Sequence, residues 1–467
     1  MAKARVGINS IMKAIINTLC AFTAVLSLSA TAQTEKPPED TREPVAADTE
    51  EFLLKTDLWD TDIKQFDKDH QKFLFKWLSS AKRGLRSEGE KITTFGVDTG
   101  EIIFGSNQGK NIKTITISLY NKGDDKKITV NALKALTKKM SERISAKTGT
   151  SPEKSTKKGA ITVQKSLWKF GKTAFLLEAS ISRADGAEFL RLRVASTKTL
   201  KDGNQTANRS SLKGNVVEDR VTGDVYLENI PMVDQGKKGY CACASAARIY
   251  QYYGLTIDQH EIAQMAGSTA AGGTSIVEMV TALKKASSEL DARVLINYEY
   301  PKNMTDKESN YKKYLSGNKE MMRDINAYQQ LAKKKGGTSF NIKGEKPYAR
   351  IPHGYTVSFQ GFIQDCDPEI YREVMMKKSS FKRWKSKIED FIDQGIPVGW
   401  CLQLGLFPEP GLPQASGGHM RLIIGYNKKT DQIIYSDSWG EGHAKKSMDA
   451  GKAFCMTNVT LVLPPSR

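Results

Sequence analysis

The chain has 467 residues, a length that allows two or three domains and a substantial buried core. Hydrophobic residues make up 39% and charged residues 26% of the sequence, which excludes a disordered tail protein, a disulfide-held miniature scaffold and a bundle of membrane spans. The formal net charge of +18 favours anionic partners in general, but the basic residues are scattered and no nucleic-acid-binding motif accompanies them, so we expect no nucleic-acid binding.

The N-terminus has the pattern of an export signal. A short, positively charged start is followed by Ala14–Leu28, which is almost wholly apolar. Ala30-Thr31-Ala32 then provides the small residues that a signal peptidase recognises. The apolar segment is short for a membrane span, and no later segment is longer. We therefore expect residues 1–32 to be a signal peptide, and the mature protein to be secreted or periplasmic with no membrane span.

The first part of the mature chain predicts an accessory domain without catalytic motifs. Residues 33–52 are acidic and contain prolines but show no apolar periodicity, so we predict a flexible linker there. From 53 to 196 the sequence mixes strand-like alternation, as around Ile117, with helical spacing between 133 and 144. These patterns predict a small α+β domain, and the polar residues 197–222 predict a second linker.

The segment 230–254 carries the strongest chemical signal. Its apolar residues recur at helical spacing: Ala246, Ile249, Tyr250 and Tyr253. Cys241 therefore stands at the N-terminus of a predicted helix, where unpaired backbone N–H groups and the positive end of the helix dipole stabilise a thiolate. Gln235, six residues earlier, would direct its side-chain NH₂ toward the same point. With the backbone N–H of Cys241 it would form an oxyanion hole.

A cysteine nucleophile needs a base and a group that orients the base. Of the five histidines, His419 begins a predicted strand directly after two glycines. A second predicted strand ends at Asp437, and a turn at residues 427–431 would place the two strands side by side. Asp437 would then accept a hydrogen bond from the His419 ring and hold its tautomer. His443 is the alternative base, although it lies in a polar stretch.

In this order the motifs resemble those of the papain-like cysteine peptidases, especially the compact bacterial branch related to double-glycine leader peptidases (peptidase C39-like). The resemblance covers residues 223–467 and implies a fold in which the cysteine-bearing helix packs on an antiparallel sheet. It also implies the site residues and their roles: Cys241 as nucleophile, His419 as base, Asp437 as the orienting residue and Gln235 as the oxyanion donor. Trp439 would shield the hydrogen bond between histidine and aspartate from water.

The other cysteines raise two questions. Ala242-Cys243 stands where the compact branch usually has Gly-Pro, so either thiol is a candidate. On a helix Cys243 points about 200° away from Cys241, and the spacing from Gln235 selects Cys241, so we expect Cys243 to pack inward. A disulfide between Cys401 and Cys455 is plausible if their strands are neighbours.

Together these patterns predict an exported α+β thiol peptidase that acts on peptide or protein substrates through a Cys-His-Asp triad and an acyl-enzyme intermediate. We expect no cofactor and no metal, because the sequence lacks ligand pairs at zinc spacing. Two alternatives stay open: a catalytically inactive, peptidase-like binding protein and a transglutaminase-like acyl transferase. A cell-wall peptidase with a Cys-His-His site fits less well, because the third residue is Asp437.

Overall fold

The computed structural model describes residues 43–465, except for these internal residues: 80–81, 107–108, 123–126, 158–160, 184–185, 199–208, 237–238, 256, 258, 267–275, 277, 282, 285–292, 303–304, 306–310, 340–347, 352–353, 358–361, 363–364, 415 and 441. The predicted signal peptide lies outside the described residues. Within the described part, no helix is both long enough and apolar enough to cross a lipid bilayer.

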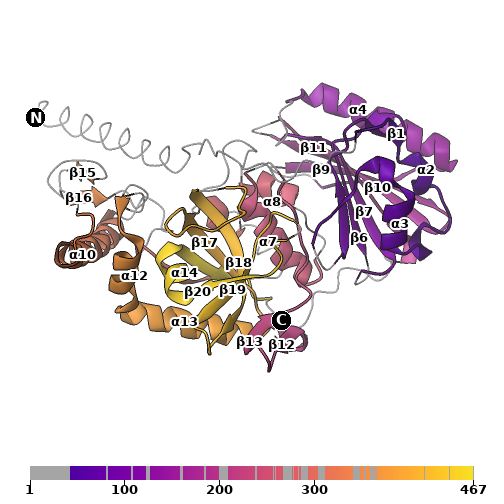
Figure 1. Cartoon of the computed structure of the whole chain (residues 1–467). Coiled ribbons are helices and arrows are strands. Elements are labelled where there is room, and N and C mark those ends of the chain that lie inside the picture. The colour runs from indigo at the N-terminus through magenta and orange to yellow at the C-terminus, as the bar shows by residue number, and fades with distance from the viewer. Residues whose placement is uncertain are drawn as a thin grey trace, which may run out of the picture.

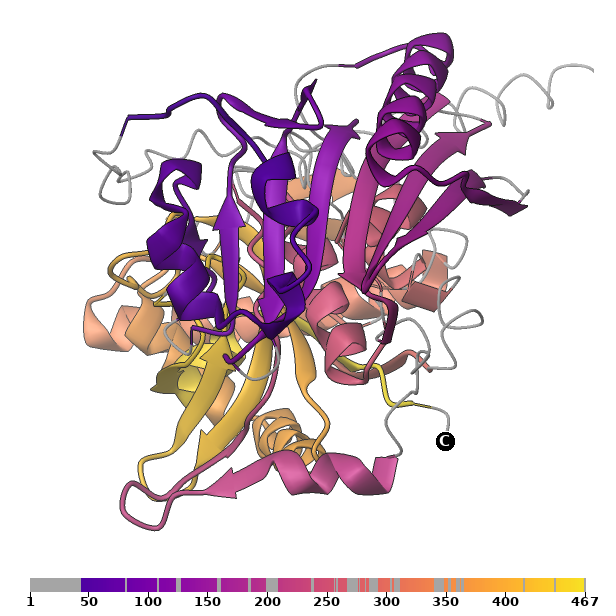
Figure 2. The same ribbon diagram turned by 90° about the vertical axis from the view of Figure 1, so that its right-hand side faces the viewer.

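The N-terminal half of the chain forms an antiparallel sheet in the order β2-β3-β6-β7-β11-β10-β9-β8. Helix α4 packs on β9, β10 and β11. Figure 2 shows this packing with the N-terminal half facing the viewer. The elements are β2 (Lys76–Trp77), β3 (Gly84–Ser87), β6 (Glu101–Ser106), β7 (Ile112–Asn121), α4 (Val130–Thr148), β8 (Glu153–Lys157), β9 (Ile161–Phe170), β10 (Thr173–Ser182) and β11 (Gly186–Ser196).

Local sequence signals account for the central elements of this half. The alternating residues around Ile117 lie in β7, and every second one faces the core. Thr129 caps α4 by accepting a hydrogen bond from the Ala132 N–H, 3.1 Å away. Gly149, with a φ of 64°, ends the same helix in a conformation that glycine adopts without strain. The α+β class that the sequence predicts is confirmed.

Regular structure begins inside the segment predicted to be the first linker. Strand β1 (Ala47–Asp48) joins β4 (Ile92–Thr94) and β5 (Val97–Asp98) in a small sheet, and helix α2 (Glu50–Leu53) follows β1. Phe52 and Leu53 are fully buried. The second predicted linker likewise contains helix α6 (Arg209–Leu212) and strand β12 (Val216–Glu218). These elements are too short to show a periodic pattern of apolar residues, so packing against the rest of the fold determines their structure.

The C-terminal half contains a second antiparallel sheet in the order β12-β13-β18-β17-β21-β14, with β19 on β18 and β20 on β19. Its remaining strands are β13 (Asp224–Leu227), β14 (Leu295–Glu299), β17 (Val398–Leu404), β18 (Gly417–Asn427), β19 (Gln432–Ser436), β20 (Lys446–Asp449) and β21 (Thr457–Val462). Each half has its own hydrophobic core. The chain therefore folds as two units around separate cores.

The helices of the C-terminal half occupy two regions (Figure 1). Helices α7 (Cys241–Tyr252) and α8 (Gln259–Ala266) lie between the C-terminal sheet and the N-terminal half. Helix α10 (Tyr311–Lys335), α12 (Pro368–Met376) and the hairpin of β15 (Tyr348–Ile351) and β16 (Gly354–Val357) lie on the far side. Helices α13 (Ser379–Ile392) and α14 (Ala450–Met456) also pack on the sheet.

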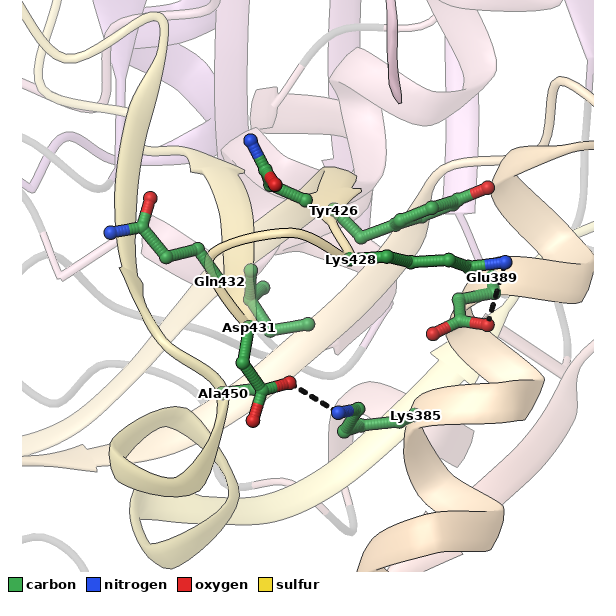
Figure 3. A pocket seen from close by; sticks show the side chains of 9 residues that line it. Lys385, Glu389, Tyr426, Lys428, Asp431, Gln432 and Ala450 are labelled. Carbon is green, nitrogen blue, oxygen red and sulfur yellow. Dashed lines mark hydrogen bonds and ion pairs between the residues drawn. The ribbon is translucent and has the colours of Figure 1, made fainter. Parts of the chain in front are cut away.

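The predicted turn between the two site strands is present. Asn427 Oδ1 accepts hydrogen bonds from the N–H groups of Lys429 and Thr430, at 2.9 and 3.1 Å. A small hollow beside this turn is closed by two ion pairs, Lys385 with Asp431 and Lys428 with Glu389, as Figure 3 shows. Its lining is Lys385, Glu389, Tyr426, Asn427, Lys428, Asp431, Gln432, Ile433 and Ala450. These contacts tie the hairpin to α13.

The two halves meet through polar side chains. Glu178 in β10 is fully buried and pairs with Arg191 and Arg193 of β11, at 2.7 and 3.1 Å. Both arginines also reach Glu261 of α8, at 2.8 and 3.1 Å. Beside them Ser180 and Gln264 exchange a hydrogen bond. The N-terminal sheet thus holds α8 of the other half by a network of buried and partly buried charges.

The condition for a disulfide between Cys401 and Cys455 is not met, because Cys455 lies in a helix rather than in a neighbouring strand. Both side chains are buried thiols, as are the other described cysteines apart from the partly exposed Cys241. Cys401 lies in β17 opposite Met420 on one side and Val459 on the other, whereas Cys455 lies in α14. Neither residue that lies opposite Cys401 on the strands paired with β17 is therefore a cysteine.

Candidate active site

Helix α7 begins at Cys241, as the sequence predicts. The helix has no side-chain cap, and its first turn is closed by the hydrogen bond from the Ala244 N–H to the Tyr240 carbonyl, 2.7 Å long. Cys241 is partly exposed, whereas Cys243 is fully buried in the core, so the expectation that Cys243 packs inward is confirmed. Ser245 donates a hydrogen bond to the Met420 carbonyl, 3.1 Å away, and thereby joins α7 to β18.

His419 and Asp437 are brought together by the pairing of β18 with β19. His419 Nε2 donates to Asp437 Oδ1 at 2.6 Å, and both side chains are fully buried. Asp437 Oδ1 also accepts from the Ser438 N–H at 2.8 Å. Within the described residues His419 Nδ1 forms no hydrogen bond of ordinary geometry, so this is the nitrogen left for the Cys241 thiol.

The charges of this group stabilise one another. Burial alone would raise the pKa of Cys241, but the nearby His419 and the Met420 N–H lower it below the ordinary value. Burial alone would lower the pKa of His419, but Asp437 and Cys241 raise it to about 9. Burial would also raise the pKa of Asp437, yet His419 and Arg421 hold it well below its usual range. The arrangement therefore favours a thiolate, an imidazolium and a carboxylate.

Trp439 and His443 lie next to this group. The Trp439 ring stacks on the His419 ring, with centroids 4.2 Å apart and an angle of 7° between the planes. His443 contacts Trp439 edge to face, with centroids 5.7 Å apart, and its carbonyl accepts from the Asp437 N–H. Burial and nearby cations lower the pKa of His443. The structure thus places His419, rather than His443, against the Asp437 carboxylate.

Arg421 is a site residue that the sequence analysis missed. It follows His419 by two positions in β18 and so faces the same side of the sheet. Its Nε donates to Asp437 Oδ2 at 2.6 Å, and its Nη1 donates to both oxygens of Glu409 at 3.0 Å. Tyr435 also donates to Glu409, at 2.6 Å. An arginine in an otherwise apolar strand was the available signal, since a buried charge requires a partner.

Arg248 is a second buried arginine that the sequence analysis missed. It lies in α7 and donates through Nε to the Pro231 carbonyl and through Nη1 to the Asp437 carbonyl, at 2.8 and 2.9 Å. It also donates to the Ser436 hydroxyl. Burial lowers the pKa of Arg248 to about 10. Arg248 therefore connects the helix that carries Cys241 to the strand end that carries Asp437.

Gln235 lies beside the segment that follows Asp437. Its backbone N–H donates to the Ser438 carbonyl at 2.8 Å, and its Oε1 accepts from the Ser438 hydroxyl at 2.7 Å. These two contacts hold the amide with its NH₂ group directed away from Ser438. Ser438 is thus a third contributor that sequence reasoning did not identify. In the described part of the chain, no group of three His, Cys, Asp or Glu residues is arranged to hold a metal ion.

Comparison with known proteins identifies the C-terminal half. Residues 227–457 match the family model described as Peptidase C39 like family, a range that includes Gln235, Cys241, His419 and Asp437. The match confirms the predicted peptidase family and enzyme class. Xylellain, a cysteine protease from Xylella fastidiosa, is similar at 12% identity and a TM-score of 0.23, covering 57% of this chain and 93% of that chain. A comparison with curated proteins finds no match.

Proposed function

We propose that this chain, whose residues 227–457 are a cysteine peptidase domain of the Peptidase C39 like family, hydrolyses peptide bonds with Cys241, His419 and Asp437. One observation carries the proposal. His419 is buried, donates through Nε2 to the Asp437 carboxylate and interacts with the partly exposed Cys241 at the start of α7. This is the arrangement that a cysteine nucleophile, its base and an orienting group require.

The proposed reaction proceeds in two steps. The Cys241 thiolate attacks the peptide carbonyl carbon and forms a tetrahedral intermediate with a negatively charged oxygen. The imidazolium of His419 gives its Nδ1 proton to the leaving amine as the C–N bond breaks, which leaves an acyl-enzyme. Neutral His419 then takes a proton from water, the water oxygen attacks the thioester, and the acid leaves as the thiolate and imidazolium are restored.

Two donors would stabilise the oxyanion of each intermediate. The first is the backbone N–H of Cys241 at the start of α7, and the second is the NH₂ group of Gln235. Removing one such donor raises the barrier by about 3–4 kcal/mol in well-studied enzymes. Ser438 is then a positioning residue, because it holds the other end of the Gln235 amide.

The experiment labels Cys241 with iodoacetamide in the absence of reductant and locates the label by peptide mapping. We expect rapid labelling of Cys241 that falls at least tenfold in His419→Ala. The Cys243→Ala variant is the matched control, since the buried Cys243 should not change the rate. Slow labelling of wild-type Cys241, or labelling independent of His419, would favour the alternative of an inactive binding protein.

The substrate class and the reaction type need a separate assay. Cleavage of fluorescein-labelled casein by wild type, and its loss in Cys241→Ala, would support a peptidase acting on polypeptides. Adding a labelled primary amine tests the transglutaminase-like alternative. A hydrolase releases new amino termini and leaves the amine unattached, whereas an acyl transferase attaches the amine to the protein substrate.

Export is a further part of the proposal, supported by the charged start, the apolar segment and the small residues at Ala30–Ala32. The proposed compartment is secreted or periplasmic. Mass spectrometry of the protein expressed with its native N-terminus would detect a chain that begins at residue 33. Retention of residues 1–32 would contradict export by this signal.

A further inference from the structure

The segment Asp234–Gln235–Gly236, which we call the oxyanion segment, is contacted directly by the N-terminal half. Arg86 of β3 donates through Nε to Glu101 Oε1 at 2.7 Å and through Nη1 to Asp234 Oδ2 at 3.3 Å. Arg86 and Glu101 lie on adjacent strands, β3 and β6, of the N-terminal sheet. The N-terminal half therefore presents an arginine that its own glutamate already orients.

The same arginine covers the other end of the oxyanion segment. Gly236 has a φ of 64°, and a Cβ added there would lie 2.4 Å from Arg86 Nη2. Such a contact is too short for any real Cβ, so the guanidinium lies directly against the backbone of Gly236. Arg86 thus touches both neighbours of Gln235, one through an ion pair and one through close packing.

Asp234 transmits this contact to the backbone of the segment. Its Oδ1 accepts from the Gly236 N–H at 2.8 Å and so closes a tight turn around Gln235. Gly440, which follows Trp439, approaches so closely that an added Cβ would lie 2.8 Å from Asp234 Oδ2. Asp234 is therefore held between Arg86 of one half and Gly440 of the other.

A second contact reaches the residue before the proposed nucleophile. His260 of α8 lies 3.6 Å from Glu101 Oε2 and shares a 2.7 Å hydrogen bond with Asn121 of β7. On the opposite side its ring meets the Tyr240 ring edge to face, with centroids 5.7 Å apart. Tyr240 precedes Cys241 at the start of α7. The N-terminal sheet thus supports the chain on both sides of the region between Gln235 and Cys241.

We infer that the N-terminal domain completes the oxyanion hole of the peptidase domain, and that Arg86 is the positioning residue that holds Gln235 in place through Asp234. The inference rests on the proposed function and names a role for the accessory domain within the same site. Under this inference the N-terminal domain is not an independent module joined to the peptidase domain only by a flexible linker. A hydrogen-bond donor that is already held in place stabilises the transition state more than a mobile donor does, because it need not be reoriented during the reaction.

The test separates the oxyanion hole from the thiolate. Iodoacetamide reacts with the thiolate by displacement and needs no oxyanion donor, whereas a peptide aldehyde such as leupeptin adds to the thiol and forms a hemithioacetal whose oxygen occupies the hole. In full-length Arg86→Met we expect an alkylation rate within twofold of wild type and an aldehyde affinity at least tenfold weaker. Gln235→Ala should show the same pattern, and the double variant should be no weaker than Gln235→Ala alone.

Two further variants make the result specific. Asp234→Asn retains an oxygen for the Gly236 N–H but loses the ion pair with Arg86, so it should reproduce the selective loss without disrupting the turn. Arg193→Met removes a charge from the same interface that contacts Glu178 and Glu261, and it should leave the aldehyde affinity unchanged. Arg86→Lys retains the charge but not the planar fork, and we expect an intermediate affinity.

The outcomes distinguish failure of this inference from failure of the proposed function. Wild type that neither alkylates quickly nor binds the aldehyde would overturn the proposed function. Normal wild-type behaviour with unchanged aldehyde affinity in Arg86→Met and Asp234→Asn would overturn the inference alone. Stronger aldehyde binding in either variant would also overturn it, since the N-terminal domain would then obstruct the site. Should Arg86→Met fail to fold, the Asp234→Asn result decides.

Discussion

The imidazole of His419 and the indole of Trp439 stack face to face, with centroids 4.2 Å apart and planes inclined by 7°. The indole covers one face of a ring whose Nε2 donates to Asp437, so water is kept from that side of the hydrogen bond. A cation over the face of a tryptophan is also stabilised by the negative charge of the π system. The stack therefore favours the protonated histidine, in the same direction as the neighbouring Asp437.

The pH dependence of Cys241 alkylation follows from these charges. The pKa of Cys241 is lowered and that of His419 is raised to about 9, which favours the thiolate and the imidazolium together. As the pH rises through 9, His419 loses its proton and the ion pair is lost. We expect the alkylation rate to reach its plateau at a lower pH than that of an ordinary thiol of pKa about 8.5, because the pKa of Cys241 is lowered. Peptide hydrolysis, which needs the His419 proton, should decline above about pH 9.

Stopped alkylation assays between pH 5 and 10 measure this profile. His419→Ala should move the midpoint upward toward that of an ordinary cysteine. A wild-type midpoint equal to that of a small-molecule thiol would contradict the ion pair.

The folded protein should offer a single reactive thiol. Burial raises the pKa of Cys366 and of Cys401 to about 12 and holds that of Cys455 well above its ordinary value, whereas the pKa of Cys241 is lowered. Titration with a disulfide reagent should therefore modify Cys241 quickly and the other thiols only on unfolding. In denaturant without reductant, the processed chain should titrate five thiols, because none of Cys241, Cys243, Cys366, Cys401 and Cys455 is in a disulfide. A titration of only three thiols would show that two of these cysteines form a disulfide.

Arg421 should matter for stability as well as for catalysis. Its guanidinium is fully buried between Asp437 and Glu409. Removing one partner of a buried ion pair costs about 3–5 kcal/mol, since the other charge is left uncompensated. We expect Arg421→Met to lose about that much unfolding free energy in urea, and the double variant Arg421→Met with Glu409→Gln to lose less. Equal losses in the two variants would show that Glu409 does not depend on Arg421.

Glu178 should make the N-terminal half sensitive to acid. Burial would raise the pKa of Glu178, but Arg191, Arg193 and Lys165 lower it from 4.5 to about 2. A lowered pKa means that the stabilisation is complete above pH 4.5 and is lost as the pH falls toward 2. A shift of this size corresponds to stabilisation on the order of 3 kcal/mol. Unfolding free energies at pH 6 and pH 3 measure the loss, and Glu178→Gln should reduce its dependence on pH; an unchanged dependence would contradict this assignment.

Local patterns in the sequence predicted much of the candidate site. A helical period located Cys241 at the first turn of α7, and two strand patterns with a turn between them placed His419 near Asp437. These features span a few residues each, so short-range preferences determine them. The spacing of six residues pointed to Gln235, and the family resemblance added the order of the motifs and the roles of the residues.

The remaining contacts depend on which surfaces meet in the folded chain. Arg86 and Asp234 are separated by 148 positions, and no periodicity relates them. The possible disulfide of Cys401 was undecided for the same reason, because the register of β17 with β18 and β21 determines which residue lies opposite Cys401. Phe52 was assigned to a linker because a single short helix has too few residues to show a period.

The place of β21 in the C-terminal sheet has a consequence for how the protein is made. Among the described strands of this sheet β21 comes last in sequence, yet it pairs with both β17 and β14, and β17 in turn pairs with the strand of His419. A chain emerges with its N-terminus first, whether from a ribosome or from an export pore. The N-terminal half can fold early, but β17, which pairs with the strand of His419, gains its second neighbour only after β21 has been made. However early the N-terminal half folds, the strand that carries His419 is therefore fully supported only after Thr457–Val462 have been made.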